Sequence, residues 1–281
     1  LIIAQCNALS SVLPGMFQKI ADYTELLFPD NLLREGSVVE RMITDIPEKD
    51  WNVEEGGQIE IIGWLYQYYM SEKHEKVVNA IGKKTVEKED IPAATELFTP
   101  DWVVRYIIDN SVGRYWIERN SNSNLKNVLE YFVAPKDGNI SIVNEKITPE
   151  QLTVFDPCMG SAHFGVYAFD VLEKIYTEYG YTEREAAALI VQNNLFGLDI
   201  DERAAQLASF AITMKAIQYD KRFLKRGIQP HFYEIKESNH VDPFTVDYFA
   251  NGNASLKRDI QSIINDTKDA KEYGSIIQIK P

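Results

Sequence analysis

Apolar side chains recur at helical spacing through the first third of the chain. The clearest case is IIGWLYQYYM within residues 58–81, where apolar positions come early and charged ones late. We expect its aromatic side chains to pack in a helical core rather than to form a stacking platform; they are Trp64, Tyr66, Tyr68 and Tyr69. Residues 83–96 are charged and then small, which is typical of a linker. The pattern therefore predicts a helical region over residues 1–95.

A second helical segment begins at Thr99-Pro100-Asp101. This triplet offers a cap residue, a proline for the first turn and an acid near the positive end of the helix. A polar loop is expected at 120–127. The turn signal Asp137-Gly138, followed by a short alternating run, predicts a small hairpin within 135–146.

From about residue 149 the pattern changes to alternating strands and helices. The strands are predicted at 152–156, 195–200, 230–237 and 275–280, and the helices at 163–179, 182–194, 201–220 and 254–267. Thr182 and Glu185 match a capping box at the start of the second of these helices. This alternation favours an α/β fold with a parallel sheet of the doubly wound kind. We therefore expect two parts, the helical region 1–95 and an α/β domain over 96–281.

Composition narrows the class of protein. The chain has 281 residues, a hydrophobic fraction of 45% and a formal net charge of −13. Such a charge disfavours a protein that grips nucleic acid unaided, because phosphate binding needs clustered Lys and Arg. The two cysteines, Cys6 and Cys158, and the four histidines show no metal-ligand spacing. No signal peptide or membrane span is evident, so we expect a cytoplasmic protein without a metal site, cut at both ends from a longer one.

The strand-to-helix turn VFDPCMGSAHF is the main candidate for chemistry. Gly160, Ser161 and Ala162 let the backbone approach a ligand, and free N–H groups at the helix start favour an anion such as a carboxylate. The turn matches neither the three-glycine dinucleotide fingerprint nor a phosphate loop, which makes a nicotinamide or flavin site a weak alternative. Asp156 and Asp199 end successive strands, and a carboxylate at the second position suits two ribose hydroxyls.

These motifs resemble those of a known family. DPCMGSAHF is similar to motif I of the adenine-specific DNA methyltransferases, ELFTPDWVVRYIIDNSVGRYW to their motif X, and NNLFGLDIDERAAQLASFAITM to motif II and its helix. Motif X before motif I is the order of the gamma-type enzymes. The phrases IIGWLYQYYMSEK, IPAATELFTPDWVVRY and DAKEYGS resemble the PglX-like methyltransferases of bacteriophage exclusion and related restriction-modification enzymes. The resemblance covers residues 58–274.

The resemblance implies a Rossmann-like methyltransferase sheet and an S-adenosylmethionine site. Phe98, Thr99 and Pro100 would border the methionine end, and Asp156, Gly160 and Ser161 would line its amino and carboxylate groups. Asp199 would hold the ribose hydroxyls, Ile200 would pack on the adenine, and Glu237 or Ser238 would lie near the adenine edge. His163, Phe164 and Cys158 are expected to pack rather than to react.

Two departures from the family pattern bear on activity. Ala162 stands where the family usually has glycine. The family's catalytic tetrapeptide, Asn or Asp followed by Pro-Pro and an aromatic residue, has no counterpart, and Asp242-Pro243-Phe244 is only a partial match. That tetrapeptide polarises and stacks a flipped adenine. We therefore expect no catalytic residue in this chain, which would be the cofactor-binding portion of an enzyme whose missing C-terminal part contacts double-stranded DNA.

Alternative functions remain open at this point. RNA and protein-glutamine methyltransferases use similar loops, although the motif X helix argues against them. A non-catalytic module that senses S-adenosylmethionine, or a scaffold that docks other defence proteins through residues 1–95, is the non-enzymatic alternative.

Overall fold

The fold is that of a computed structural model, which describes residues 2–17, 19–20, 23–27, 31–32, 34–52, 58–59, 61–80, 85–95 and 98–274. Three short parallel strands lie at its centre: β1 (Val154–Asp156), β2 (Leu195–Asp199) and β3 (His231–Glu234). Their spatial order is β1-β2-β3, with Val154 opposite Leu195 and Phe196 opposite His231. The predicted mixed α/β class and the first three predicted strands are confirmed. The strand predicted at 275–280 lies outside the described residues.

Helices connect these strands. They are α8 (His163–Tyr179), α9 (Glu183–Leu189), a π-helical turn at Ile190–Asn194, and α10 (Glu202–Tyr219). The Thr182–Glu185 capping box is present at the start of α9, as predicted. A short 3-10 turn, Phe223–Arg226, leads from α10 toward β3. These crossovers keep the three strands parallel and bring their carboxyl ends to one edge of the sheet.

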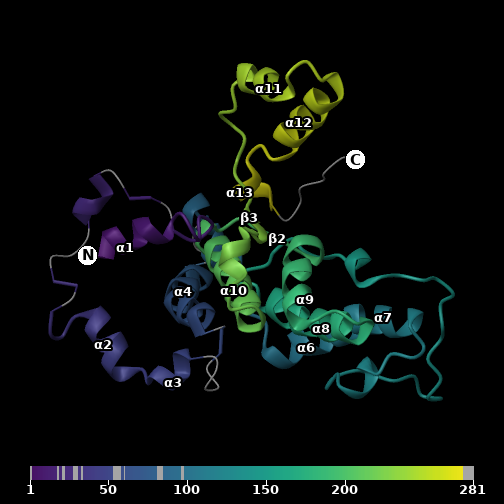
Figure 1. Ribbon diagram of the computed structural model, residues 1–281. Helices are drawn as coiled ribbons and strands as arrows, with labels where there is room; N and C mark the ends of the chain where they lie inside the picture. The colour runs from purple at the N-terminus through teal and green to yellow at the C-terminus, as the bar shows by residue number, and fades with distance from the viewer. Residues whose placement is uncertain are drawn as a thin grey trace.

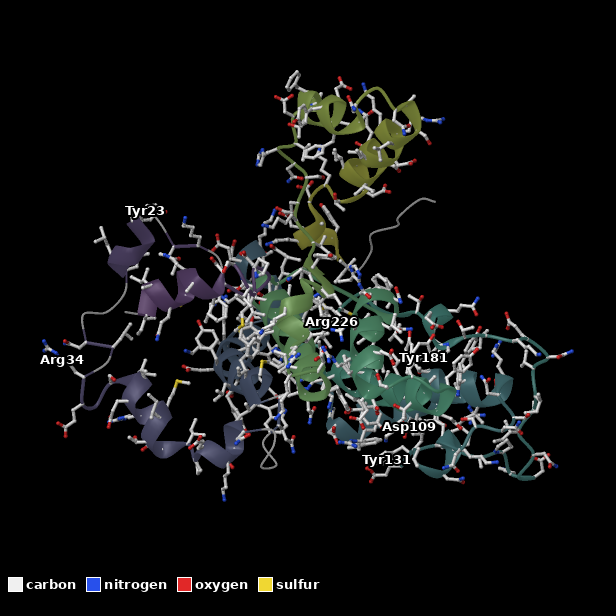
Figure 2. The ribbon with its side chains drawn as sticks, viewed as in Figure 1. Tyr23, Arg34, Asp109, Tyr131, Tyr181 and Arg226 are labelled. Carbon is white, nitrogen blue, oxygen red and sulfur yellow. The ribbon has the colours of Figure 1, made fainter. Side chains whose placement is uncertain are left out.

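Motif X folds as α6 (Asp101–Ile108), a π-helical turn at Asp109–Gly113 and α7 (Arg114–Arg119). The helix starts where predicted, but the cap role expected of Thr99 was wrong, because Pro100 occupies the cap position and makes no side-chain hydrogen bond. Asp109 is fully buried and accepts hydrogen bonds from the Tyr131 N–H (2.9 Å) and the Tyr167 hydroxyl (2.8 Å). Figure 2 labels Asp109 and Tyr131 side by side. Asp109 thereby ties α6 both to the loop after α7 and to α8.

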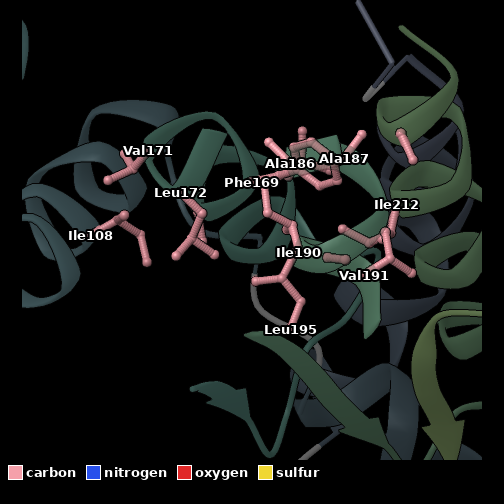
Figure 3. Packing of buried hydrophobic residues seen from close by; sticks show 14 of the residues in the cluster. Ile108, Phe169, Val171, Leu172, Ala186, Ala187, Ile190, Val191, Leu195 and Ile212 are labelled. Carbon is pink, nitrogen blue, oxygen red and sulfur yellow. The ribbon is translucent and has the colours of Figure 1, made fainter. Parts of the chain in front are cut away.

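The hydrophobic core lies between the sheet and the helices α8, α9 and α10. Phe169 and Leu172 from α8, Ile190 and Val191 from the π turn, and Ile212 from α10 are almost completely inaccessible to solvent. Figure 3 shows these side chains converging with Leu195 of β2. The burial of apolar surface in this cluster fixes β1 and β2, and with them the loops that follow both strands.

The N-terminal helices are α1 (Ile2–Leu9), α2 (Val38–Asp45), α3 (Glu48–Trp51), α4 (Ile61–Ala80) and α5 (Ile91–Thr95), with 3-10 turns at Tyr23–Leu27 and Lys88–Asp90. The linker predicted at 83–96 was therefore wrong for its described residues 88–95, which are helical. Tyr66, Met70 and Ala93 form a small cluster with Ala204 of α10, and Figure 1 shows α4 beside α10. The predicted division at residue 95 stays a prediction.

Two further expectations need correction. Tyr66 packs in a core as predicted, but Trp64, Tyr68 and Tyr69 are 38%, 78% and 64% exposed, so core packing was wrong for these three. The turn at Asp137-Gly138 is present, yet residues 135–146 form no strand. There the Val143 N–H donates to the Glu118 carbonyl, which anchors the segment to α7 rather than to a hairpin partner.

The C-terminal helices are α11 (Pro243–Ala250), α12 (Ala254–Asp266) and α13 (Ala270–Tyr273). Figure 1 shows α11 and α12 away from the helices that cover the sheet. Asp242 caps α11 by accepting the Phe244 N–H, so the partial match to the catalytic tetrapeptide is a helix start. Within the described residues, no helix has the length and apolarity needed to cross a membrane.

Candidate cofactor site at the strand ends

The two acids that end β1 and β2 lie at the same edge of the sheet. Asp156 is opposite Gly197, and Asp199 follows two residues later on β2. Between β1 and α8, the loop 157–162 turns toward β2: the Met159 N–H donates to the Leu198 carbonyl over 3.0 Å. Parallel strands thus bring together two acids that are separated by one crossover in the sequence.

Asp199 accepts hydrogen bonds from two different segments at this edge of the sheet. Its Oδ2 accepts the Gly160 N–H over 2.9 Å, and its Oδ1 accepts the Asp201 N–H over 2.8 Å. Asp156 makes a local contact, accepting the Cys158 N–H over 3.1 Å. Sequence reasoning named Asp199 as a ligand contact but missed that the same carboxylate fixes the loop.

Gly197 in β2 is a residue that the sequence analysis did not single out. A Cβ on Gly197 would lie 2.4 Å from Met159 Sδ and 2.8 Å from a ring carbon of Phe232. The absent side chain therefore makes room for Met159, which is buried and belongs to the loop. Because Gly197 has no side chain, the loop can pack directly against β2. Its signal in the sequence was a lone glycine inside an apolar strand.

The loop backbone enters the left-handed region twice, at Gly160 (φ +54°) and Ala162 (φ +69°). Glycine adopts this conformation freely, whereas alanine pays roughly 1–2 kcal/mol for its Cβ. Ala162 is fully buried, and its methyl group packs in the core. The left-handed backbone at Ala162 lowers the stability of the fold, whereas burial of the Ala162 methyl group raises it.

We expect Ala162→Gly to change the free energy of unfolding by less than about 1 kcal/mol. Glycine relieves the left-handed strain, but it loses about 0.8 kcal/mol of methyl burial and gains freedom in the unfolded chain. Ala162→Val should cost more than about 2 kcal/mol, since a β-branched residue resists positive φ and the site is closed. Urea titrations followed by circular dichroism measure both. Equal stability of the valine variant and the wild type would contradict a strained, filled position.

Phe98, Thr99 and Pro100 lie at a neighbouring cavity of about 620 Å³. Its wall also includes His163, the first residue of α8, so the structure brings motif X next to the start of motif I's helix. Asp156, Gly160 and Asp199 are absent from that wall. The predicted methionine-end residues thus share a cavity with His163, whereas the predicted ribose ligand contacts the loop at Gly160, and the two groups do not line one cavity.

Other charged and aromatic side chains complete this cavity. Tyr167 and Asp170 follow His163 on one face of α8, and Lys215 of α10 pairs with Asp170 over 2.7 Å. The sequence analysis did not identify these residues as part of a site. Their spacing along α8, four residues from His163 to Tyr167 and three more to Asp170, would have placed them on one helix face. From α4 come Trp64 and Gln67.

The remaining predicted site residues are engaged elsewhere. Glu237 pairs with Lys88 over 2.8 Å, and this contact is the main reason that its pKa lies below the ordinary value. The Ser238 hydroxyl donates to the Ile264 carbonyl of α12. Ile200 is half-buried directly after Asp199. The roles of these residues near an adenine stay predictions.

Burial raises the pKa of both strand-end carboxyls above the ordinary aspartate value, although backbone N–H donors partly counteract it. Their mutual proximity adds to the shift at Asp156. Desolvation, together with the charges of Asp156 and Asp199, also raises the pKa of the Cys158 thiol. Cys158 is nevertheless exposed, so the expectation that it packs as a small buried side chain was wrong. A thiol of raised pKa is a poor nucleophile.

A pH dependence follows from these shifts. The folded chain holds protons on Asp156 and Asp199 more tightly than the unfolded chain, so their contribution to stability is lost as the pH rises from 3.8 through the raised pKa values. Binding of a hydroxyl-rich ligand has the opposite sign, because ionised Asp199 is the better acceptor. The raised pKa means that Asp199 takes up its proton at a higher pH than an ordinary aspartate, whose pKa is 3.8. As the pH is lowered, we therefore expect the affinity for S-adenosylmethionine to weaken before the pH reaches 3.8. Titrations of folded protein at stepped pH test this, and constant affinity down to pH 3.8 would contradict it.

In the part of the chain that the structure describes, no three His, Cys, Asp or Glu side chains gather as a metal site would require.

Comparison with known proteins places these features in a family. The profile described as N-6 DNA Methylase matches residues 111–260. The chain is 45% identical over 245 residues to the adenine-specific methyltransferase BrxX of Escherichia coli strain HS, and 43% identical over 251 residues to the adenine-specific methyltransferase PglX of Lacticaseibacillus casei strain Zhang. Each alignment covers 85% of this chain and 20% of the relative.

A more distant relative comes from Methanocaldococcus jannaschii. It is a putative type II restriction enzyme and methyltransferase, 25% identical over 193 residues, which are 60% of this chain and 15% of the relative. The chain thus spans about a fifth or less of the length of these curated relatives. The family profile nevertheless matches more than half of the chain and includes both strand-end acids and the loop between them. The chain therefore belongs to the N-6 DNA methylase family.

Proposed function

We propose that this chain binds S-adenosylmethionine and forms the cofactor-binding part of an adenine-specific DNA methyltransferase. The observation that carries the proposal is the Asp199 carboxylate at the end of β2. Its two oxygens accept the Gly160 and Asp201 N–H groups, and the Ile200 N–H also stabilises the charged carboxylate. A carboxylate has about four acceptor positions, so these backbone donors do not occupy all of them. Two adjacent ribose hydroxyls need two acceptors in one plane, which this carboxylate offers.

The fold supports the same proposal. Three parallel strands in the order β1-β2-β3, joined by helices, correspond to one half of a doubly wound sheet. In such sheets ligands bind beyond the carboxyl ends of the strands, where Asp156 and Asp199 lie. A Rossmann-like methyltransferase sheet is thus the architecture that we propose for the complete domain.

The loop has features that a bound amino-acid group would use. Ser161 Oγ is buried and has no hydrogen-bond partner, and such an orphaned group calls for a ligand or a rearrangement. No atom lies within 4 Å of where a Cβ on Gly160 would be, so open space borders the backbone there. Both observations fit the proposed methionine contacts of Asp156, Gly160 and Ser161.

S-adenosylmethionine, when bound, supplies an activated methyl group. The chain's own contribution would be to hold and orient it: Asp199 on the ribose hydroxyls and Ile200 on the adenine face. Phe98, Thr99 and Pro100 would border the methionine end, while Glu237 and Ser238 would lie toward the adenine edge. Half-burial of Asp156 and Asp199 strengthens their hydrogen bonds relative to those in water.

DNA is the proposed substrate, because the family profile names DNA and two relatives are named adenine-specific. This favours DNA over the RNA and protein alternatives. The chain carries a net charge of −13 and contains neither an Asn-Pro nor a Pro-Pro pair. In a longer cytoplasmic protein, other segments would contact the DNA and polarise the adenine. A role in restriction or defence, with partner proteins, is proposed by analogy with these relatives.

Calorimetric titration of the chain with S-adenosylmethionine tests the proposal, with NAD as the comparison ligand. We expect saturable binding of one S-adenosylmethionine and none of NAD. Tighter binding of NAD would contradict the proposal. Failure of a folded chain to bind S-adenosylmethionine would also count against it if a longer protein containing this sequence behaves in the same way.

A further inference from the structure

Helix α4, in the N-terminal region, contacts the strand-end site at two points. The Tyr66 hydroxyl donates to Asp201 Oδ2 over 2.5 Å. One turn earlier, Gly63 is so close to the loop that an added Cβ would lie 2.8 Å from Ser161 Oγ and 3.2 Å from Ser161 Cβ. These contacts join segments that are about a hundred or more positions apart in the sequence.

A chain of hydrogen bonds leads from α4 to the loop. Tyr66 holds the Asp201 side chain, the Asp201 N–H donates to Asp199 Oδ1, and Asp199 Oδ2 accepts the Gly160 N–H. The other Asp201 oxygen accepts the Arg203 N–H and caps α10. Asp201 therefore links three elements: α4, the end of β2 and the start of α10.

Tyr66 is itself held in place. It is 9% exposed and packs with Met70, Ala93 and Ala204, with Phe98 and Leu207 at the margin of the cluster. A tyrosine that served only as apolar filling would not need its hydroxyl at this position. The Tyr66 hydroxyl donates to Asp201, the residue that orients Asp199, whereas Tyr68 on the same helix is 78% exposed.

We infer that Tyr66 is a positioning residue for the cofactor site, acting through Asp201 to hold the Asp199 carboxylate and the Gly160 loop in one arrangement. The identity of the ligand rests on the proposed function, whereas the hydrogen bonds that position Asp199 do not depend on it. Helix α4 is accordingly part of the cofactor site rather than only a docking element for other proteins. Gly63 is the second contact, allowing α4 to lie directly on Ser161.

The test compares Tyr66→Phe with the matched control Tyr68→Phe in this chain. Amide hydrogen exchange without any cofactor reports on Gly160 and Asp201, whose N–H groups are bound to Asp199. We expect both amides to exchange about three- to tenfold faster in Tyr66→Phe, the effect of one lost hydrogen bond. Amides at the centre of α8, near Leu172, should keep their wild-type rates in both variants.

The second readout is S-adenosylmethionine affinity. We expect Tyr66→Phe to weaken it about three- to tenfold and Tyr68→Phe to leave it unchanged. Asp201→Asn and the double variant complete a cycle: if Tyr66 acts through Asp201, their effects on affinity are less than multiplicative. Gly63→Ala, which moves α4 away from Ser161, should also weaken binding.

The outcomes separate the two proposals. Unchanged exchange at Gly160 and Asp201 in Tyr66→Phe would overturn the positioning role, whatever the affinity. Faster exchange with unchanged affinity would show a purely structural contact and overturn the link to the cofactor. If the wild-type chain binds no S-adenosylmethionine, the proposed function fails, while the exchange rates still decide whether Tyr66 positions Asp199.

Discussion

Replacing Asp199 by asparagine is expected to weaken S-adenosylmethionine binding by about 10- to 100-fold. The carboxylate is proposed to accept two ribose hydroxyls, and charge-assisted hydrogen bonds contribute about 1.5–3 kcal/mol. Asparagine keeps the shape but turns an NH₂ group toward one of the two backbone donors, the Gly160 or the Asp201 N–H. The measurement is the dissociation constant by calorimetry.

The matched control for this prediction is Asp259→Asn. Asp259 is an exposed acid of α12, so its loss changes the net charge by the same amount as Asp199→Asn. The affinity of the Asp259→Asn variant for S-adenosylmethionine should stay within about twofold of the wild type, as expected for a screened, distant charge. An equal, small effect of both substitutions would mean that Asp199 does not contact the cofactor.

Phe169→Ala is expected to cost about 3–5 kcal/mol of unfolding free energy. Phe169 has no exposed surface and stacks on Tyr219, with ring centroids 5.7 Å apart. It lies where α8 meets α10, so its truncation leaves a cavity between the helices that follow β1 and β2. Such a loss is a large share of the 5–15 kcal/mol typical of whole domains.

Urea unfolding followed by circular dichroism measures this loss, with Phe244→Ala as the control. Phe244 is 75% exposed on α11, and its truncation should change the free energy by only about 0.5 kcal/mol. If the two variants unfold at the same urea concentration, the core does not lie between α8 and α10 as described.

The strands and the site loop could be predicted from the sequence because their signals are local. An apolar run ending in Asp156, a small-residue turn and a periodic helix specify a strand, a loop and a helix without reference to the rest of the chain. The same holds for the Thr182–Glu185 cap, whose two hydrogen bonds span three residues. The order of these local signals also indicated which strand ends would share an edge.

The contacts that fix the site could not be predicted in this way. Asp199 accepts an N–H from Gly160, which is 39 positions away, and Tyr66 reaches Asp201 across 135 positions. Such pairs depend on the packing of whole helices, which periodicity does not specify. For the same reason the exposure of Tyr68 was missed: α4 carries aromatic side chains around much of its circumference, so the pattern did not distinguish its buried face.

A crystal structure of the chain with S-adenosylhomocysteine, the demethylated form of the cofactor, tests the central claim most directly. We expect both ribose hydroxyls within about 2.6–3.2 Å of the Asp199 carboxylate oxygens, with the amino-acid end beside Gly160 and Ser161. A ligand seated instead in the cavity between Trp64 and Lys215, without contact to Asp199, would contradict the account.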